Sequence, residues 1–121
     1  MVNKWEIYYC ELNPAQGSEQ QVIRPVMVIS NDIVNHLLPV STVLPFSSIK
    51  PGDRIYPTEI ELPAKMTGLP KDSVAMIQQI RTVAHARLSN KAGALEDISL
   101  RDQIKDALRE YFELTQSLKA N

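Results

Sequence analysis

Hydrophobic and polar positions alternate at the start of the chain and predict a β-strand there. Within residues 4–12, Trp5, Ile7 and Tyr9 occupy every second position, which is the period of a strand that buries one face. The next segment, residues 13–21, is polar and contains a proline and a glycine, as is typical of a surface loop. The chain is therefore expected to open with a half-buried strand followed by a polar loop.

Four further segments carry a strand pattern, either the same alternation or a short β-branched apolar run. They are residues 25–30, 40–46, 58–62 and 73–83, the last of which is expected to be bent. Pro45 has no N–H for a ladder, so its strand should meet a sheet edge or a bulge there. A helical turn is expected over residues 33–38. Five short strands without long helices between them predict an antiparallel sheet or a small barrel.

The C-terminal part of the chain changes to a helical spacing. Apolar residues recur every three or four positions, at Leu100, Ile104, Leu108, Tyr111, Leu114 and Leu118. This stripe predicts an amphipathic helix whose apolar face packs on the core. Ser99 is the expected N-cap, and Asp102 in the first turn favours the helix dipole. Residues 1–121 are thus expected to form one domain that is mainly β with one long helix, an α+β arrangement.

The composition restricts the class of protein. Of the 121 residues, 44% are hydrophobic and 22% are charged, a balance typical of a soluble globular domain. No apolar run approaches the ~20 residues of a membrane span, and the first residues lack the apolar stretch of a signal peptide. Cys10 is the only cysteine, so neither an internal disulfide nor a cysteine-rich zinc site is expected. We therefore expect a cytoplasmic protein without membrane contact.

Charge and motifs exclude several kinds of site. The net charge of −1, from 13 basic and 14 acidic side chains, argues against a strongly basic nucleic-acid coat but leaves room for a small basic groove. A Gly-rich phosphate loop, GxSxG and HExxH are absent. His36 and His85 lie far apart, and nothing in the sequence brings them together. We therefore expect no metal, no cofactor and no catalytic histidine pair.

Arg24 is the most informative single residue. It follows a polar loop and directly precedes Pro25 and a buried strand, so the proline biases it to an extended backbone. A guanidinium fixed at the end of a strand can present its planar fork of donors to phosphate oxygens. A structural pair with a nearby carboxylate, such as that of Glu19, explains it equally well. The residues alone leave both interpretations open.

Two segments carry a resemblance to a known family. The first is GSEQ at residues 17–20, followed after three residues by RPVMVISND at residues 24–32. The second is KDSVAMIQQIRTVAHARL at residues 71–88. Together they resemble the paired signatures of the MazF/PemK toxins, the endoribonuclease components of bacterial toxin–antitoxin pairs. The resemblance continues into the C-terminal helix and covers nearly the whole chain.

The resemblance implies a fold, an activity and partners. The implied fold is an SH3-like barrel of the CcdB/PemK type, built of antiparallel strands with a C-terminal helix and usually assembled as a homodimer. The implied activity is metal-independent cleavage of single-stranded RNA at short sequences, which leaves a 2′,3′-cyclic phosphate and a 5′-hydroxyl. The implied partner is a cognate antitoxin protein that covers the RNA groove.

Individual residues match the functional positions of that family. The resemblance implies that Arg24 is the catalytic arginine and Ser47 the catalytic hydroxyl, although the neighbouring Ser48 leaves the second assignment open. Both types fit the chemistry, because attack by a 2′-hydroxyl needs alignment and donors aimed at the phosphate charge. Matches to substrate-binding positions are Ser18, Glu19, Gln20 and Gln79.

Residues 48–56 form the loop that is expected to set RNA selectivity. Lys50 and Arg54 can contact phosphates, and Tyr56 can stack on an unpaired base. For the two cations, ordinary solvated charge is an equally weighted alternative.

Three positions depart from the family pattern. Gln78 replaces an acidic residue that can serve as a general base, Gln21 replaces a glycine, and Trp5 stands where a glycine usually follows the first basic residue. Trp5 is expected to pack rather than to stack on a base. Three hypotheses follow: a sequence-specific endoribonuclease toxin, a CcdB-like gyrase-poisoning toxin without RNase activity, or a weakened RNA-binding or regulatory homologue, which Gln78 favours.

Overall fold

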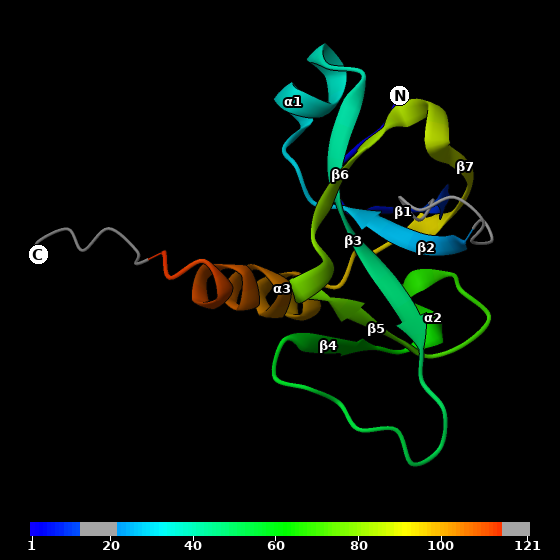
Figure 1. Cartoon of the computed structure of the whole chain (residues 1–121), viewed down its shortest axis with the longest axis vertical. Coiled ribbons are helices and arrows are strands. Elements are labelled where there is room, and N and C mark those ends of the chain that lie inside the picture. Colours follow the sequence, from blue (N-terminus) through cyan, green and yellow to red (C-terminus); the bar gives the residue numbers. More distant parts are fainter. Residues whose placement is uncertain (13–21, 115–121) are drawn as a thin grey trace, which may run out of the picture.

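The structure, a computed structural model, describes residues 1–12 and 22–114 (Figure 1). Its strands are β1 (Glu6–Glu11), β2 (Ile23–Val28), β3 (Val40–Ser48), β4 (Glu59–Leu62), β5 (Ser73–Met76), β6 (Arg81–Ala84) and β7 (Leu88–Ala94). Its helices are α1 (Asp32–Leu37), α2 (Ala64–Thr67) and α3 (Ile98–Tyr111), with two 3-10 turns, η1 (Ile77–Gln79) and η2 (His85–Arg87). The predicted architecture, mainly β with a long helix near the C-terminus, is confirmed.

The strand β3 is the centre of the sheet. The strand order is β4-β5-β3-β2-β1-β7, β6 also pairs with β3, and every pair is antiparallel. β3 pairs with β6 from Val40 to Val43 and with β5 from Phe46 to Ser48. Pro45 falls between these two ladders and is also the last β3 residue paired with β2. The interruption that the missing N–H predicts therefore occurs at Pro45, where β3 changes partner.

Two strand predictions need correction. The segment 73–83 is not one bent strand, because η1 separates β5 from β6. β7 was not predicted, since its sequence LSNKAGA lacks both alternation and β-branched residues. It forms because β1 provides a partner edge, along which Glu6 pairs with Ala94 and Cys10 with Leu88. The described residues therefore contain seven strands rather than five.

The helix α3 begins slightly earlier than predicted. Its N-cap is Asp97, not Ser99, and the Asp97 carboxylate accepts a 3.1 Å hydrogen bond from the Leu100 N–H. Ile104 is buried, and Leu100 and Leu108 are partly buried against the core. The helix ends at Tyr111, which is earlier than the stripe predicts, and Leu118 lies outside the described residues. No helix in the described ranges is long and apolar enough to cross a membrane.

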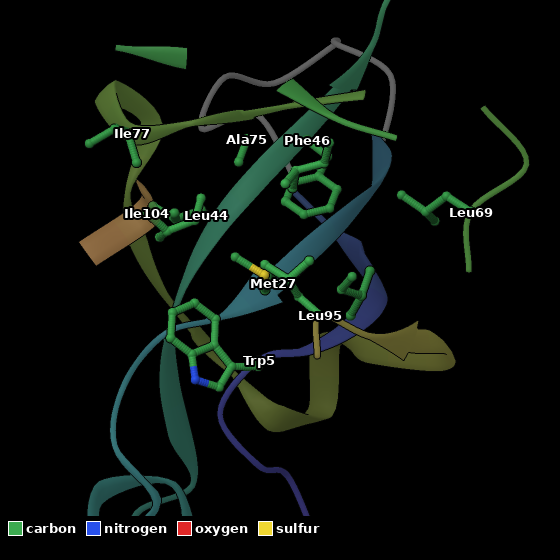
Figure 2. Packing of buried hydrophobic residues seen from close by; sticks show 11 residues of the cluster. Trp5, Met27, Leu44, Phe46, Leu69, Ala75, Ile77, Leu95 and Ile104 are labelled. Atoms are coloured by element: carbon green, nitrogen blue, oxygen red, sulfur yellow. The ribbon is translucent and has the colours of Figure 1, made fainter. Parts of the chain in front are cut away.

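The sheet separates two groups of buried side chains. On β2, Met27 belongs to the larger group, whereas Val26 and Val28 belong to the smaller one with Cys10, as the alternation of a strand requires. Figure 2 shows the larger group, with Trp5 at one end and Phe46 and Ala75 at the other. Trp5 is 7% exposed, so the prediction that it packs in the core is confirmed.

Two glycines hold α2 against β7. Gly68 ends α2 with φ of 83°, the left-handed conformation that glycine adopts without strain. A Cβ on Gly93 would overlap the Thr67 carbonyl oxygen, and a Cβ on Gly68 would overlap that of Ala92. The two backbones are therefore in direct contact, and this contact positions the loop that leads from α2 into β5.

Candidate active site

A cavity of about 250 Å³ lies where β2 begins, β3 ends and the α2–β5 loop passes. The polar side chains that line it are Tyr9, Arg24, Ser47, Ser48, Lys71 and Ser73. Its apolar part includes Phe46 at one end of the core shown in Figure 2 and Leu69. The cavity therefore combines cations and hydroxyl groups above an apolar floor, and it holds both residues predicted to be catalytic.

The register of β2 and β3 explains why Arg24 and Ser47 meet. The last ladder pair joins Val26 to Pro45. Two residues further along each strand, Arg24 and Ser47 take facing positions, and the alternation of the strands puts them on the same face. Ser48 stands on the opposite face of β3, the face that also carries Phe46, and it lines the cavity as well. Register thus couples the guanidinium to Ser47 more directly than to Ser48.

Arg24 is exposed, and its guanidinium is not engaged by a carboxylate of the described part of the chain. The two ion pairs found there are Glu6 with Lys91 and Asp106 with Arg109. Glu19, the alternative partner considered from the sequence, lies outside the described residues together with Ser18 and Gln20. Within the described residues, the donors of Arg24 are therefore available to an anion in the cavity.

Lys71 lines the same cavity and was not singled out from the sequence. The loop that carries it is anchored by its neighbour Asp72, whose carbonyl accepts from Ile49 N–H at 3.0 Å and whose carboxylate accepts from Ala64 N–H at 2.8 Å. The one sequence signal for Lys71 is that it begins the second family signature, residues 71–88. Only the pairing of β3 with β5, which sets Ser48 opposite Ser73, brings that loop to Ser47.

A larger hollow of about 700 Å³ lies between α3 and the segment containing Pro57 and Ile60. Its arginine, Arg109, is already paired with Asp106 at 2.7 Å, and the neighbouring lining residues include Glu110. The hollow is therefore less suited to an anionic substrate than the smaller cavity around Arg24.

Comparison with known proteins identifies the family. The family model described as PemK-like, MazF-like toxin of type II toxin-antitoxin system matches residues 3–112. The chain belongs to this family. Endoribonuclease EndoA of Bacillus subtilis (strain 168) is 37% identical over 109 residues, which cover 90% of this chain and 92% of that protein. The family predicted from the two sequence signatures is thus confirmed.

Solved structures support the fold. An endoribonuclease in complex with its cognate antitoxin from Mycobacterial species has a TM-score of 0.75 at 18% identity, covering 97% of this chain and 100% of that chain. MazE–MazF (Form-II) from Deinococcus radiodurans also has a TM-score of 0.75, at 21% identity, covering 94% of this chain and 97% of that chain. At these identities the likeness concerns the fold, and it confirms the predicted MazF-type architecture.

The remaining predicted substrate-binding residues of this PemK/MazF family member do not line the cavity. Lys50, Arg54 and Tyr56 lie exposed in the loop between β3 and β4, and the Arg54 guanidinium lies 5.5 Å from the Tyr56 ring centroid. Gln79 is exposed in η1, next to Gln78. The structure thus brings Arg24, Ser47 and Ser48 together but not these four residues.

The two histidines have separate partners. The His36 Nε2 lies 2.8 Å from Asn3 Oδ1, and the His85 Nε2 lies 2.7 Å from Ser41 Oγ. The Ser41 hydroxyl also donates to the buried Asn35 side chain at 2.6 Å. The His36 bond joins α1 to the N-terminal segment, and the Ser41 bonds join α1 and η2 to β3, so the histidines act in the packing of this toxin-family fold, outside the cavity lining.

Proposed function

We propose that this chain is an endoribonuclease toxin of a type II toxin–antitoxin system and that it cleaves single-stranded RNA. The observation that carries the proposal is the facing placement of Arg24 and Ser47 in one cavity, in a member of the PemK/MazF family. The name of the 37% identical relative, an endoribonuclease, supports the same activity.

The cavity is suited to an internal transfer reaction. The 2′-oxygen of the RNA attacks the adjacent phosphorus, the bond from phosphorus to the 5′-oxygen breaks, and the products are a 2′,3′-cyclic phosphate and a 5′-hydroxyl. The 2′-hydroxyl proton passes to solvent, and the leaving 5′-oxygen takes a proton from solvent. Because the nucleophile belongs to the substrate, the protein has to align the reacting atoms and stabilise charge.

Arg24 and Ser47 have distinct roles in this reaction. The Arg24 guanidinium donates to the equatorial phosphate oxygens, where negative charge develops. It does not transfer the proton, because a guanidinium hardly deprotonates. The Ser47 hydroxyl donates to a phosphate oxygen and keeps the attacking and leaving oxygens in line. Gln78 is exposed and outside the cavity lining, so no protein base at that position is needed in this scheme.

The RNA on either side of the cleaved bond is assigned to the other substrate-binding residues predicted from the sequence. They are Ser18, Glu19, Gln20, Lys50, Arg54, Tyr56 and Gln79. Charge on Lys50 and Arg54 suits the phosphates, and the Tyr56 ring, which is 53% exposed, suits stacking on a base.

The proposed partners are an antitoxin protein and a second copy of the chain. The fold is shared with an endoribonuclease solved in complex with its cognate antitoxin, which supports the first. A homodimer is expected from the family and is tested by sedimentation at micromolar protein concentration, where a monomer would contradict it.

One experiment tests the activity. The purified chain is incubated with RNA of mixed sequence in the presence of a chelator, and new 5′-hydroxyl ends are mapped. Discrete cuts that are absent with Arg24→Ala support the proposal, and RNA with a 2′-deoxy residue at the cut site should resist. No cleavage, with breaks in DNA that depend on gyrase, would support the CcdB-like alternative. Binding of RNA without cleavage would support the weakened homologue.

A further inference from the structure

Trp5 is held in an unusual backbone conformation. Its φ is 75°, and among the described residues the only other non-glycine residue with positive φ is Glu113. The left-handed region costs a side-chain-bearing residue about 1–2 kcal/mol. The conformation is fixed from both sides, because Trp5 N–H donates to the Val28 carbonyl at 2.7 Å and its own carbonyl accepts from Leu95 N–H at 2.9 Å. A strained residue held this firmly calls for a functional explanation.

Three cations surround the Trp5 ring. The Lys4 Nζ lies 5.1 Å from the ring centroid, the Arg101 Cζ lies 5.3 Å from it, and the Lys105 Nζ lies 6.0 Å from it. Arg101 and Lys105 are one turn apart on α3, so they share a face of that helix. Each contact is a favourable cation–π interaction, but together they gather three positive charges around one ring.

These three cations form no ion pair within the described part of the chain. Its two ion pairs involve neither Lys4, Arg101 nor Lys105. Arg101 Nε donates to the Leu95 carbonyl at 2.6 Å, which leaves the rest of the guanidinium without a carboxylate.

Three acidic residues lie near these cations in the chain or in space: Asp97 and Asp102 at the start of α3, and Asp32. The Asp32 Oδ1 accepts from the backbone N–H of Lys4 at 2.7 Å and from Asn35 at 3.1 Å. Burial lowers the pKa of the Lys4 ammonium, and the charges of Lys105 and Arg101 lower it further, while Asp32 opposes them. The three cations therefore repel one another, and an anion placed between them would relieve this repulsion.

The neighbourhood favours a protein ligand over a nucleic acid. Trp5 is 7% exposed and cannot stack on a base, although stacking is the usual support for single-stranded RNA. Ile98, which is 64% exposed, lies three residues before Arg101 and seven before Lys105, so it shares their face of α3. An apolar side chain among cations contributes nothing to phosphates but complements a peptide that alternates acidic and apolar residues.

We propose that Lys4, Arg101, Lys105 and Ile98 form a docking site for an acidic, partly apolar peptide segment of a partner protein. The site is separate from the candidate active site, because Trp5 and Phe46 lie at opposite ends of the core (Figure 2) and Phe46 lines the cavity around Arg24. Occupation of the site and of the cavity are therefore independent, and the docking site does not rest on the proposed RNA cleavage.

The chain carries its own reporter for this site. Trp5 is the only tryptophan, so its fluorescence and its indole N–H signal in NMR spectra report directly on the three cations. The full chain is titrated with a short synthetic peptide rich in glutamate and leucine, and in parallel with the same peptide carrying lysine in place of glutamate. Only the acidic peptide should shift the Trp5 signals saturably, and its affinity should fall as salt is raised.

Substitutions locate the effect. The double variant Lys4→Gln with Lys105→Gln should weaken binding of the acidic peptide about tenfold. Lys65→Gln removes an exposed lysine on α2 and should leave the affinity for the acidic peptide unchanged. Arg24→Ala should also leave this affinity unchanged, so the result of the peptide titration is distinguishable from that of the RNA cleavage test. Ile98→Ser should weaken the leucine-containing peptide but not an all-glutamate peptide.

Two results would overturn the proposal. One is the absence of any saturable Trp5 response, or a response that the double variant leaves intact while circular dichroism shows a native fold. The other is a Trp5 response to single-stranded RNA that is lost in the double variant and is stronger than the response to the peptide. That result would assign the cations to nucleic acid instead.

Discussion

Arg24 and Ser47 face each other across β2 and β3, two residues beyond the last ladder pair, Val26 with Pro45. Their relation is set by sheet register, and both residues line the same cavity. A site positioned by strands is held more precisely than one positioned by loops. Substitutions of Arg24 and of Ser47 should therefore have distinguishable effects on the rate of RNA cleavage.

Arg24→Ala should lower kcat for RNA cleavage by about 10²–10³-fold, because a donor aimed at developing phosphate charge is lost. Arg24→Lys should recover only part of this, since an ammonium keeps the charge but not the planar fork. The measurement is single-turnover cleavage of a defined RNA at saturating enzyme. Arg87→Ala, at an exposed arginine in η2, is the control and should cleave normally. Equal rates for Arg24→Ala and the wild type would exclude the proposed role.

The serine pair can be separated by the same assay. Ser47→Ala should lower kcat by about tenfold or more through loss of a hydroxyl that orients the phosphate, and Ser47→Thr should retain most activity. Ser48→Ala should stay close to the wild type, because Ser48 stands on the other face of β3. The reverse ranking would assign the catalytic hydroxyl to Ser48.

Lys71 should act as a phosphate contact beside Arg24. Lys71→Gln should weaken RNA binding about equally for all sequences and lower the slope of log affinity against log salt by about 1. Filter binding at several salt concentrations with uncleavable 2′-deoxy substrate measures the slope. Lys65→Gln provides a lysine outside the cavity and should leave the slope unchanged. An unaltered slope for Lys71→Gln would place Lys71 outside the substrate path.

Glu6 should make stability depend on pH. Burial raises the pKa of its carboxyl, but hydrogen bonds from Lys91, Tyr8 and Asn3 outweigh burial and lower the pKa from 4.5 to about 2. A depressed pKa means that the stabilisation is complete above about pH 4.5 and is lost as the pH falls toward 2.

Glu6→Gln should therefore lower the free energy of unfolding at pH 7 by about 1–3 kcal/mol, and the difference from the wild type should shrink as the pH is lowered through this window. Urea unfolding at a series of pH values measures it. A difference that is independent of pH would show that the charge of Glu6 is not what stabilises the fold.

Gly93→Ala should destabilise the domain by about 2–4 kcal/mol, because the added Cβ meets the rigid Thr67 carbonyl and forces α2 away from β7. Gly52→Ala is the matched substitution, since no atom lies within 4 Å of a Cβ there and only its φ of 85° opposes the change. Its cost should be about 1–2 kcal/mol. Thermal unfolding compares the two, and equal losses would show that the close contact carries no cost.

The sequence predicts an element best where the spacing of its apolar residues matches the period of the strand or helix that forms. The alternation through Trp5, Ile7 and Tyr9 and the stripe through Ile104 correspond to β1 and α3. β7 could not be predicted because its stability comes from the edge of β1 and not from its own residues. The N-cap was misplaced by two residues because serine and aspartate both cap well, and only the path of the chain after β7 selects Asp97.

The candidate site was predictable to the extent that it lies on strands. Arg24 directly precedes one predicted strand and Ser47 directly follows another, and the family resemblance implies a role for both. Lys71 depends on the packing of α2 on β7 and on the pairing of β3 with β5, which no local pattern encodes. The positive φ of Trp5 likewise cannot be predicted from local patterns; the one sequence signal is that tryptophan replaces the glycine expected from the family resemblance.

The contact between Gly68 and Gly93 affects how the cavity can change over evolution. The backbone contact between Gly68 and Gly93 positions the start of the α2–β5 loop. The side chains of Pro70 and Lys71 do not take part in this contact. In a chain that keeps both glycines, substitutions at these two positions should therefore change the side chains that line the cavity while the backbone of the loop keeps its position.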